Sequence, residues 1–467
     1  MMRPWAARLL APWVALALVA VGCASEATSP APPVGEGEDE PGSTDEPDAR
    51  PDDPDPTPAP ADPEEGGTAA PVEPSEPDSP GAPPADPEGP LDETGTPPMR
   101  AVWVHLFDET LKHRDGIARL IEELVTADAT AVIAQVARRH DAYYRSKVLP
   151  ATTDPDLEPG LDVVAELTRR AQEVGIEVHA WFSIAPTWHP VYEPLPAPDG
   201  WVATEHGRTA NEGSRWVSRT RDGVWTEYLD PGVPAVRDHV AAVVTELAAT
   251  TEVDGIHLDY VRYENERAGY HPIALQRYRS ETGTAGTPAV DDPRWSDWRR
   301  AQTRALLDRA RLAIADVERE VELSAAVVTW GPGPAEAGGF DGTRTATEAL
   351  QDWPSWVRDG ALDSVLPMNY FRAHLPEQAA WFGDWLTFEE QLATEHRTRV
   401  VPGIAGWLND ADAVGPQLGT ALDATDGAAL YSYQQPAEDA VVDPEAAAVR
   451  PFWGGLATSD WGAGSAR

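Results

Sequence analysis

Short apolar segments alternate with amphipathic segments along most of the chain beyond Met99. The apolar segments are rich in β-branched and aromatic residues, which is typical of β-strands. Eight of them occur, at 99–107, 129–137, 176–185, 253–263, 322–328, 362–370, 399–406 and 427–435. Between them, a period of 3.6 residues predicts helices over 115–126, 161–174, 234–248 and 297–319. Gly175 predicts the end of the second helix, and Asp230 predicts the N-cap of the third.

The repeated alternation indicates the fold class. Eight strand–helix repeats predict an α/β protein, a (βα)8 TIM barrel of parallel strands. We expect the barrel to span residues 98–440, with a C-terminal extension at 441–467. A doubly wound open sheet alternates in the same way, but no glycine-rich phosphate loop follows the first strand, which favours the barrel.

Residues 1–22 are typical of a secretory signal peptide. Arg3 and Arg8 give the segment a positive start, and its apolar run is much shorter than the roughly twenty residues of a bilayer-spanning helix. The segment ends in Ala-Val-Gly-Cys at 20–23, which resembles a bacterial lipoprotein box. We therefore predict lipidation of Cys23; an ordinary secretory signal with an incidental cysteine is the alternative.

Residues 23–97 are predicted to form a disordered stalk. Positions 24–97 hold 20 prolines and 21 Asp plus Glu against one Arg, with no aromatic residue. Such a segment buries too little apolar surface to offset the entropy of ordering. We expect the stalk to hold the barrel away from a membrane, so that the protein acts in the cell envelope, anchored by lipid and facing outside the cytoplasm.

Composition excludes several classes of protein. The single cysteine rules out an internal disulfide scaffold and a cysteine-based metal site. The formal net charge of −42 argues against a nucleic-acid partner, because a polyanion would be repelled. We predict no metal and no cofactor.

The strand at 253–263 provides the central candidate for chemistry. Active sites of barrels lie at the carboxyl ends of the strands, and side chains alternate between the axis and the helices. The alternation predicts that His257, Asp259 and Val261 face the axis, and that Ile256, Leu258 and Tyr260 face the helices. An inward carboxylate at a strand end is costly to bury unless it has partners, so Asp259 is the preferred catalytic candidate.

Other strand ends add aromatic and polar side chains to the same pocket. Aromatic faces stack on sugar rings, polar groups bind hydroxyls, and a carboxylate suits an oxocarbenium-like transition state. The predicted substrate-binding residues from these ends are His105, His179, Trp181, Arg262, Tyr263, Asn369, Tyr370, Trp407 and Gln434. Three inward histidines could instead ligate zinc, but the first strand lacks a His-x-His pair and the fifth and eighth strands offer no ligand.

Several motifs, taken together and in order, are similar to those of the glycosyl-hydrolase-like ten family. They are MRAVWV at 99–104, DAYYRSKVLP at 141–150, GIEVHAWF at 175–182, YLDPGVPAVRDHV at 228–240, VDGIHLDYVRY at 253–263 and QDWPSWVRDGALDSVLPMNY at 351–370. The resemblance implies a (βα)8 barrel and a bacterial envelope lipoprotein that acts on peptidoglycan glycan strands. It also implies that Asp259 is the strand-four aspartate of the family, flanked by His257, Arg262 and Tyr263, with Asn369 and Tyr370 at the end of strand six.

The chain departs from the family pattern in two places. Many members have Arg and then Gly where this chain has Ala137 and His140, although Arg138 is close by and is a predicted substrate-binding residue. Many members have Pro where this chain has Glu264. The second departure leaves two interpretations open for Glu264, an added acid or a solvated loop residue.

A glycosidase normally needs two carboxyl groups, and the sequence assigns only Asp259. The candidates for the second are Asp108, Asp141, Glu264 and Asp352. Asp141 is preferred because it follows the second strand in a segment that matches the family, so the predicted catalytic set is Asp259, His257 and Asp141.

The sequence therefore predicts an extracytoplasmic, lipid-anchored glycoside hydrolase that acts on a cell-envelope polysaccharide such as peptidoglycan glycan strands. Because the second carboxyl is not assigned, a non-catalytic carbohydrate-binding lipoprotein with the same barrel is the alternative.

Overall fold

The computed structural model describes residues 97–187, 197–440, 450–459 and 461, and the statements below concern these residues. The predicted signal peptide, Cys23 and almost all of the predicted stalk lie outside this range. No helix within the described residues has both the length and the apolar character needed to cross a membrane.

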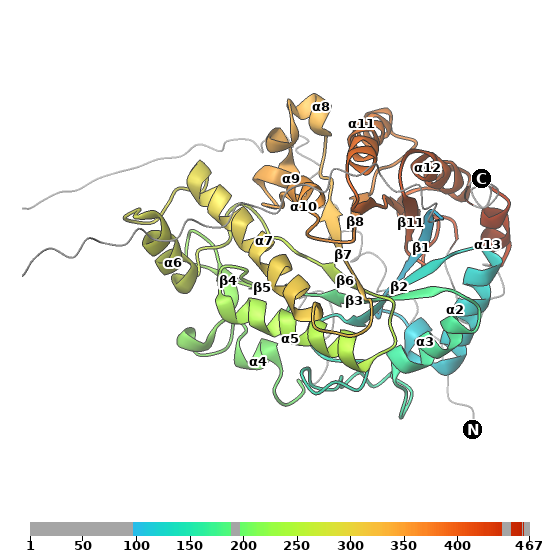
Figure 1. Ribbon diagram of the computed structural model, residues 1–467, viewed down its shortest axis with the longest axis horizontal. Helices are drawn as coiled ribbons and strands as arrows, with labels where there is room; N and C mark the ends of the chain where they lie inside the picture. Colours follow the sequence, from blue (N-terminus) through green and yellow to red (C-terminus); the bar gives the residue numbers. More distant parts are fainter. Residues whose placement is uncertain (1–96, 188–196, 441–449, 460, 462–467) are drawn as a thin grey trace, which may run out of the picture. The chain divides into compact units, whose positions relative to one another are not determined.

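The core of the structure is a closed barrel with eight positions for parallel strands (Figure 1). Seven positions are single strands, and the other is divided into β9 and β10 by Val401 and Pro402. The strands are β1 (Met99–Val104), β2 (Ala131–Ala137), β3 (Glu177–Ser183), β6 (Gly255–Asp259), β7 (Glu322–Val328), β8 (Ser364–Asn369), β9 (Arg399–Val400), β10 (Gly403–Ala405) and β11 (Gly427–Tyr431). The strands β1 to β9 pair in this order, β11 pairs with β1, and β10 pairs with both β8 and β11, which closes the barrel.

Helices cover the outside of the barrel (Figure 1). The longer ones are α2 (Arg114–Thr126), α3 (Val163–Gln172), α5 (Pro234–Thr250), α6 (Pro272–Thr282), α7 (Pro293–Ile314), α11 (Pro376–Glu395), α12 (Ala411–Ala424) and α13 (Arg450–Ala457). The short ones are α4 (Val202–Glu205), α8 (Pro334–Ala337), α9 (Arg344–Thr347) and α10 (Trp353–Arg358), together with the 3-10 turns η1 (Thr110–Lys112), η2 (Glu212–Ser214), η3 (Phe340–Gly342) and η4 (Gly406–Leu408).

The (βα)8 barrel predicted from the alternation is thus confirmed, with a strand at each of the eight predicted segments. Gly175 adopts a left-handed conformation (φ 73°) just beyond α3, as the helix-end prediction requires. The predicted N-cap at Asp230 is wrong, because α5 is preceded by Val233. Asp230 instead accepts hydrogen bonds from the Gly232 N–H (2.8 Å) and the Ser218 hydroxyl (2.9 Å).

The two faces of the barrel strands pack into separate apolar clusters. The inner cluster fills the barrel and consists of Met99, Ala101, Trp103, Ala131, Ile133, Trp181, Leu366, Val401 and Ala429. Branched side chains on the outer face, such as Val132 and Ile256, join the helices in a much larger cluster. Because both faces of every strand are covered, the strands read as nearly continuous apolar runs.

A long excursion between β3 and α5 adds an antiparallel hairpin, formed by β4 (Val217–Arg219) and β5 (Trp225–Leu229). The hairpin is tied to the segment that follows β3. The Thr187 N–H donates to the Glu227 carbonyl (2.9 Å), and the Leu229 N–H donates to the Ala185 carbonyl (2.8 Å). Since β3 ends at the carboxyl end of the barrel, these bonds bring β5 to that end.

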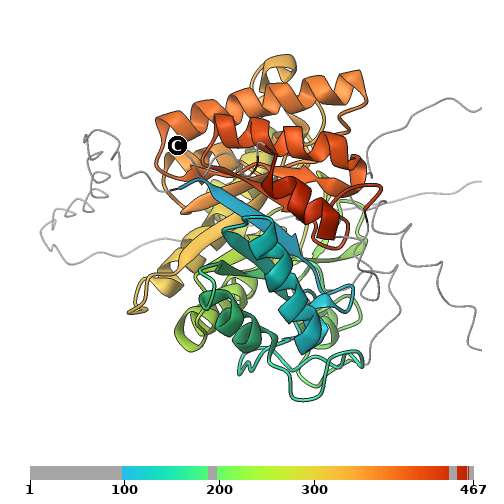
Figure 2. The ribbon, with the colours of Figure 1, turned by 90° about the vertical axis from the view of Figure 1, so that its right-hand side faces the viewer.

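The C-terminal residues pack on the barrel. Helix α13 lies beside α2, as Figures 1 and 2 both show. Trp453 of α13 stacks on Tyr433 with a centroid distance of 5.5 Å, and the Trp461 indole donates to the Ala127 carbonyl (2.9 Å).

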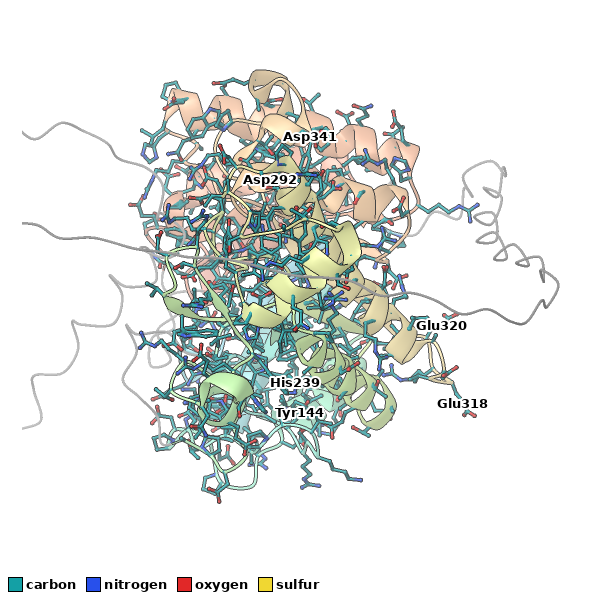
Figure 3. The ribbon with its side chains drawn as sticks, turned by 90° about the vertical axis from the view of Figure 1, so that its left-hand side faces the viewer. Tyr144, His239, Asp292, Glu318, Glu320 and Asp341 are labelled. Carbon is teal, nitrogen blue, oxygen red and sulfur yellow. The ribbon has the colours of Figure 1, made fainter. Side chains whose placement is uncertain are left out.

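The turn between α7 and β7 lies at the amino end of the strands, opposite the carboxyl end that holds β5. It carries the exposed side chains of Glu318 and Glu320 (Figure 3).

Candidate active site

Asp259 is the last residue of β6 and is 8% exposed. One carboxylate oxygen accepts a hydrogen bond from the Tyr260 N–H (2.7 Å), and the other accepts one from the Trp181 indole (3.2 Å). Burial raises the pKa of Asp259 to about 6, although the Arg262 charge and both hydrogen bonds act in the opposite direction. A carboxyl group in this state changes its charge near neutral pH, as acid–base and nucleophilic chemistry require.

Arg262 lies among aromatic rings beside Asp259. Its guanidinium carbon is 5.0 Å from the centroid of Trp330, 5.1 Å from that of Tyr260 and 5.9 Å from that of Tyr228. Within the part of the chain that the structure describes, this guanidinium forms no ion pair. Its charge therefore remains available to Asp259 and to a ligand at the mouth.

Further aromatic side chains continue around the mouth, half-buried at Tyr370 and Tyr431 and buried at Trp181 and His105. Tyr431, the last residue of β11, is 5.5 Å from Tyr370 and 6.2 Å from Trp181 between ring centroids. His105, beyond β1, is 6.4 Å from Tyr431. Of the predicted residues, Trp181, Arg262 and Tyr370 thus lie around Asp259, and His105 lies beside Tyr431.

His257 lies one layer below Asp259, inside the barrel. Its Nε2 accepts a hydrogen bond from the Trp103 indole (3.3 Å), and its Nδ1 bonds to the Ser324 hydroxyl (2.9 Å). Burial lowers the pKa of His257 to about 3, so the ring is neutral at neutral pH. Both nitrogens are engaged and the residue is fully buried, so this geometry gives His257 a packing role beneath the site.

The predicted second acid, Asp141, belongs to a different region. It is fully buried and forms a salt bridge with Arg139 at 3.0 Å. The Arg139 guanidinium lies 4.8 Å from the centroid of Trp201, and the Trp201 indole donates to the Arg139 carbonyl (2.6 Å). These contacts hold the loop after β2 against the long excursion between β3 and α5. They account for the burial of Asp141, and Asp259 takes no part in them.

Arg138 and Gln434 both hold the loops at the mouth. Arg138 donates to the Leu106 carbonyl (2.8 Å) and forms an ion pair with Asp154 (3.3 Å). The Gln434 amide donates to the His105 carbonyl (3.0 Å), which ties the end of β11 to the end of β1. Their polar groups are therefore used within the protein.

Three further predicted residues do not lie at the mouth. His179 pairs with Gly255 in register, whereas Ser183 pairs with Asp259. At roughly 3.3 Å per residue, His179 therefore lies about 13 Å deeper in the barrel than the level of Asp259. Gly255 makes room for it, since a Cβ there would be 2.2 Å from its Nδ1. Tyr263 is 1% exposed and lies beneath the Arg299 guanidinium, 5.9 Å from its ring centroid.

Asn369 is the third of these residues, and it points away from the barrel axis. Its amide donates to the Glu389 carboxyl of α11 at 2.7 Å, outside the barrel. Asn369 shares the orientation of Val365, which packs in the outer cluster, whereas Leu366 packs in the inner one. Burial raises the pKa of Glu389 well above its usual range, against the hydrogen bond from Asn369.

Trp407 lies in η4, directly after β10, and is half-buried.

The predicted alternation of side chains beyond Asp259 is wrong. Val261 packs in the outer cluster, and the Tyr260 ring lies against Tyr228 (5.7 Å) and Arg262. Tyr260 has a positive φ of 63°, which ends the strand and reverses the side-chain order.

Sequence reasoning did not identify Tyr228, Tyr260, Trp330 and Tyr431 as residues of the site. The alternation along β11 could have identified Tyr431, because Ala429 of the same strand faces inward. No local signal exists for Tyr228, since only the β4–β5 hairpin brings it to the mouth.

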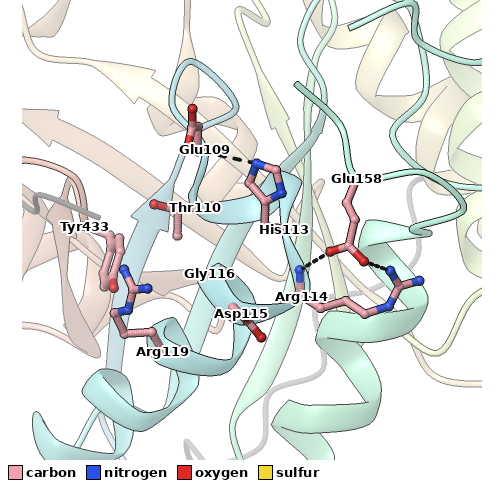
Figure 4. A pocket seen from close by; sticks show the side chains of 9 residues that line it. All are labelled: Glu109, Thr110, His113, Arg114, Asp115, Gly116, Arg119, Glu158 and Tyr433. Atoms are coloured by element: carbon pink, nitrogen blue, oxygen red, sulfur yellow. Dashed lines mark hydrogen bonds and ion pairs between the residues drawn. The ribbon is translucent and has the colours of Figure 1, made fainter. Parts of the chain in front are cut away.

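A separate pocket of about 550 Å³ lies between the first turns of α2 and the loops that follow β1 and β11 (Figure 4). Four of its side chains form two pairs. Glu109 is 4.0 Å from His113, and Glu158 pairs with the Arg114 side chain and accepts from the Arg114 N–H (2.9 Å). Asp259 does not line this pocket.

Within the described residues, no group of three His, Cys, Asp or Glu side chains could hold a metal ion.

A parallel (βα)8 barrel with a buried carboxyl group and aromatic side chains at the carboxyl end of its strands has the groups that glycosidases of this fold use. The chain matches the glycosyl hydrolase-like 10 family over residues 98–407, and it belongs to that family. The resemblance inferred from the motifs is thereby confirmed.

Named relatives agree with this assignment. Glycosyl hydrolase DigH of Escherichia coli (strain K12) is 25% identical over 346 residues, which cover 67% of this chain and 74% of DigH. Glycosyl hydrolase YngK of Bacillus subtilis (strain 168) is 22% identical over 292 residues, which cover 58% of this chain and 54% of YngK.

Solved structures share the fold. The glycoside hydrolase domain of PgaB (BpsB) from Bordetella bronchiseptica aligns with a TM-score of 0.51 at 17% identity, covering 76% of this chain and 99% of that domain. The catalytic domain of β-amylase from Paenibacillus polymyxa aligns with a TM-score of 0.53 at 11% identity, covering 76% and 98%. At these identities the likeness concerns the barrel alone.

Proposed function

We propose that this protein is a glycoside hydrolase that cleaves a cell-envelope polysaccharide, such as peptidoglycan glycan strands, with Asp259 as the central carboxylate. The observation that carries the proposal is the state of Asp259, which is buried at a strand end, bonded through both oxygens and has a pKa of about 6. Membership of a glycosyl hydrolase-like family supports the reaction class.

The arrangement suits the transition state of glycoside hydrolysis. Positive charge develops on the sugar ring as the glycosidic bond breaks, and an ionised Asp259 stabilises that charge or bonds to the anomeric carbon. Trp181 and Tyr260 hold the carboxylate through N–H donors, which keeps its oxygens oriented. The rings of Tyr370 and Tyr431 provide faces on which sugar units stack.

The proposal includes a location. The lipoprotein-like sequence at 20–23 and the proline-rich acidic segment that follows support a lipid anchor on Cys23, outside the cytoplasm. The partners would then be the membrane, through that lipid, and an extracellular polysaccharide. Metabolic labelling of the expressed chain with a radioactive fatty acid tests the anchor: we expect label in wild type and none in Cys23→Ala, and equal labelling would contradict it.

The hydrolysis proposal is tested with the wild-type protein and its Asp259→Asn variant. Both are incubated with peptidoglycan glycan strands, with and without stem peptides, and with a panel of polysaccharides, and products are identified by mass spectrometry. We expect products from wild type alone. Binding of a glycan without products from either protein, with Trp407→Ala weakening that binding, would instead support the non-catalytic carbohydrate-binding alternative.

A further inference from the structure

We infer that the β4–β5 hairpin (Figure 1) carries a second binding surface for the substrate, which holds a carboxylate-bearing stretch of the polysaccharide beyond the mouth of the barrel. The surface, which we call the hairpin surface, consists of Trp225 and the guanidinium groups of Arg215, Arg219 and Arg221. This inference rests on the proposed hydrolase function and names its substrate class, a glycan with acidic sugars.

Trp225, the first residue of β5, is the centre of the hairpin surface. The guanidinium carbons of Arg215 and Arg219 lie 4.8 Å and 5.4 Å from the centroid of its ring. Trp225 and both of these arginines are half-buried, whereas Arg221 and Val224, in the turn before β5, are exposed. The surface is therefore open to solvent, and one aromatic ring holds two positive charges close together.

The three arginines are fixed in direction but keep their terminal amino groups. Each donates through Nε to a backbone carbonyl oxygen: Arg215 to Ala210 (2.9 Å), Arg219 to Gly223 (3.0 Å) and Arg221 to Pro288 (3.1 Å). Within the part of the chain that the structure describes, none of the three forms an ion pair. Their Nη groups therefore form planar forks of the kind that matches the two oxygens of a carboxylate.

The acidic side chains of the hairpin are paired with other arginines. Glu227 of β5 forms an ion pair with Arg208 (2.9 Å), and Asp222 of the turn forms one with Arg267. The chain as a whole has a formal net charge of −42, so carboxylates are in excess over cations. Arginines that have no carboxylate partner in such a chain favour an anion from outside the protein.

The hairpin surface adjoins the mouth of the barrel through β5. Tyr228 lies three residues beyond Trp225, and its ring centroid is 5.9 Å from the Arg262 guanidinium carbon at the mouth. Between its two pairings with β4, strand β5 has three residues where β4 has one, so it bulges there and strict alternation of side chains does not apply. An extended chain spans at most about 3.6 Å per residue, so the Cα atoms of Trp225 and Tyr228 are no more than about 11 Å apart. A short oligosaccharide spans this distance.

The substrate strand is the occupant that both the charge and the position of the hairpin surface favour. Arg262 also forms no ion pair within the described residues, so positive charge continues from the hairpin toward Asp259. An anionic lipid surface, or the acidic segment at 24–97 of this chain, would satisfy the arginines but would not account for their connection to the mouth. A carboxylated glycan that is cut beside Asp259 accounts for both.

Binding of a matched pair of glycans tests this inference in the full chain. The first probe is peptidoglycan glycan strands freed of stem peptides, whose muramic acid units carry a free carboxylate. The second probe is the same strands after methyl esterification, which removes the negative charges and keeps the backbone. All proteins carry Asp259→Asn so that the strands stay uncut, and Kd is measured by isothermal titration calorimetry at low and at high salt.

The double variant Arg219→Gln/Arg221→Gln should raise Kd for the first probe about tenfold at low salt, because charge-assisted hydrogen bonds to carboxylates are lost. The difference should shrink at high salt, and Kd for the esterified probe should change by less than about twofold. Arg221→Gln alone, at an exposed position, should raise Kd for the first probe about threefold. The control Arg169→Gln removes an arginine from α3, on the outside of the barrel, and should leave both Kd values unchanged.

The outcomes separate this inference from the proposed function. An unchanged Kd for the first probe in the folded variants, equal affinity for both probes, or no binding of the first probe would overturn the hairpin surface. Stronger binding of vesicles that contain an anionic lipid, lost in the double variant, would assign the arginines to a membrane and would also overturn it. Products from wild type without any effect of the hairpin variants would overturn this inference alone. Hairpin-dependent binding without products from wild type would overturn the hydrolase proposal and leave the surface as part of a carbohydrate-binding protein.

Discussion

Two buried aspartates, Asp141 after β2 and Asp259 at the end of β6, lie on either side of β3, and they differ in how their charge is compensated. Asp141 is bonded to the Arg139 guanidinium through two nitrogens, at 3.0 and 3.2 Å, and both side chains are buried. Asp259 accepts hydrogen bonds from two N–H donors, and the cation that acts on it, Arg262, lies against three aromatic rings. Burial therefore has different consequences at the two positions. At Asp141 it encloses an ion pair in which one carboxylate oxygen takes both bonds and the other has no hydrogen-bond partner among the described residues, and at Asp259 it raises the pKa of the carboxyl group.

The largest expected effect on stability concerns Asp141. The Asp141→Asn change keeps the shape of the side chain but leaves the buried Arg139 charge unpaired, which should reduce the free energy of unfolding by about 3–5 kcal/mol. Urea unfolding at pH 7, with Glu320→Gln as the control, measures the change. A loss below about 1 kcal/mol would mean that the ion pair is not structural.

The same substitution at Asp259 should increase the free energy of unfolding. The pKa of Asp259 is about 6 in the folded protein, above its ordinary value of 3.8, so wild type loses stability as pH rises between these values. The Asp259→Asn variant has no such penalty, and it should be more stable than wild type by up to about 3 kcal/mol at pH 8. Most of this gain should vanish at pH 4. Destabilisation at pH 8 would contradict the unpaired state of Asp259.

A smaller effect is expected from Arg262→Gln. The Arg262 charge lowers the pKa of Asp259, so its removal should raise that pKa and move the acid limb of kcat/KM to higher pH by about one unit. The matched change Arg139→Gln should leave the acid limb in place in the fraction of molecules that folds. A shift to lower pH in Arg262→Gln would show that another group controls the limb.

The sequence was sufficient for the barrel because the signal is repeated eight times, and each strand is apolar on both faces. The same property limits the prediction of side-chain direction. Asn369 was placed at the mouth, yet it faces α11, since an apolar run does not reveal which alternate residues face inward. At β6 the alternation gave His257 and Asp259 correctly and then failed at Tyr260, where φ becomes positive.

Long-range contacts account for the residues that were missed. Tyr228 reaches the mouth because the β4–β5 hairpin bonds to the segment after β3, and no periodicity in the sequence encodes that contact. The place of Asp141 after β2 favours it as the second acid, but its pairing with Arg139 depends on the folded chain and has no signal in the sequence. Position along a strand indicates which end of the barrel a residue occupies, whereas the identity of its partners decides what it can do.

Chemical rescue is the sharpest test of whether Asp259 acts as a carboxylate at the reacting centre. Hydrolysis is measured for Asp259→Ala and Asp141→Ala, each with and without sodium formate or sodium azide. We expect Asp259→Ala to lose activity about a thousandfold, and we expect the small anion, placed in the vacated space, to restore part of it. Asp141→Ala should not be rescued. Hydrolysis by Asp259→Ala at the wild-type rate would show that Asp259 is not at the reacting centre.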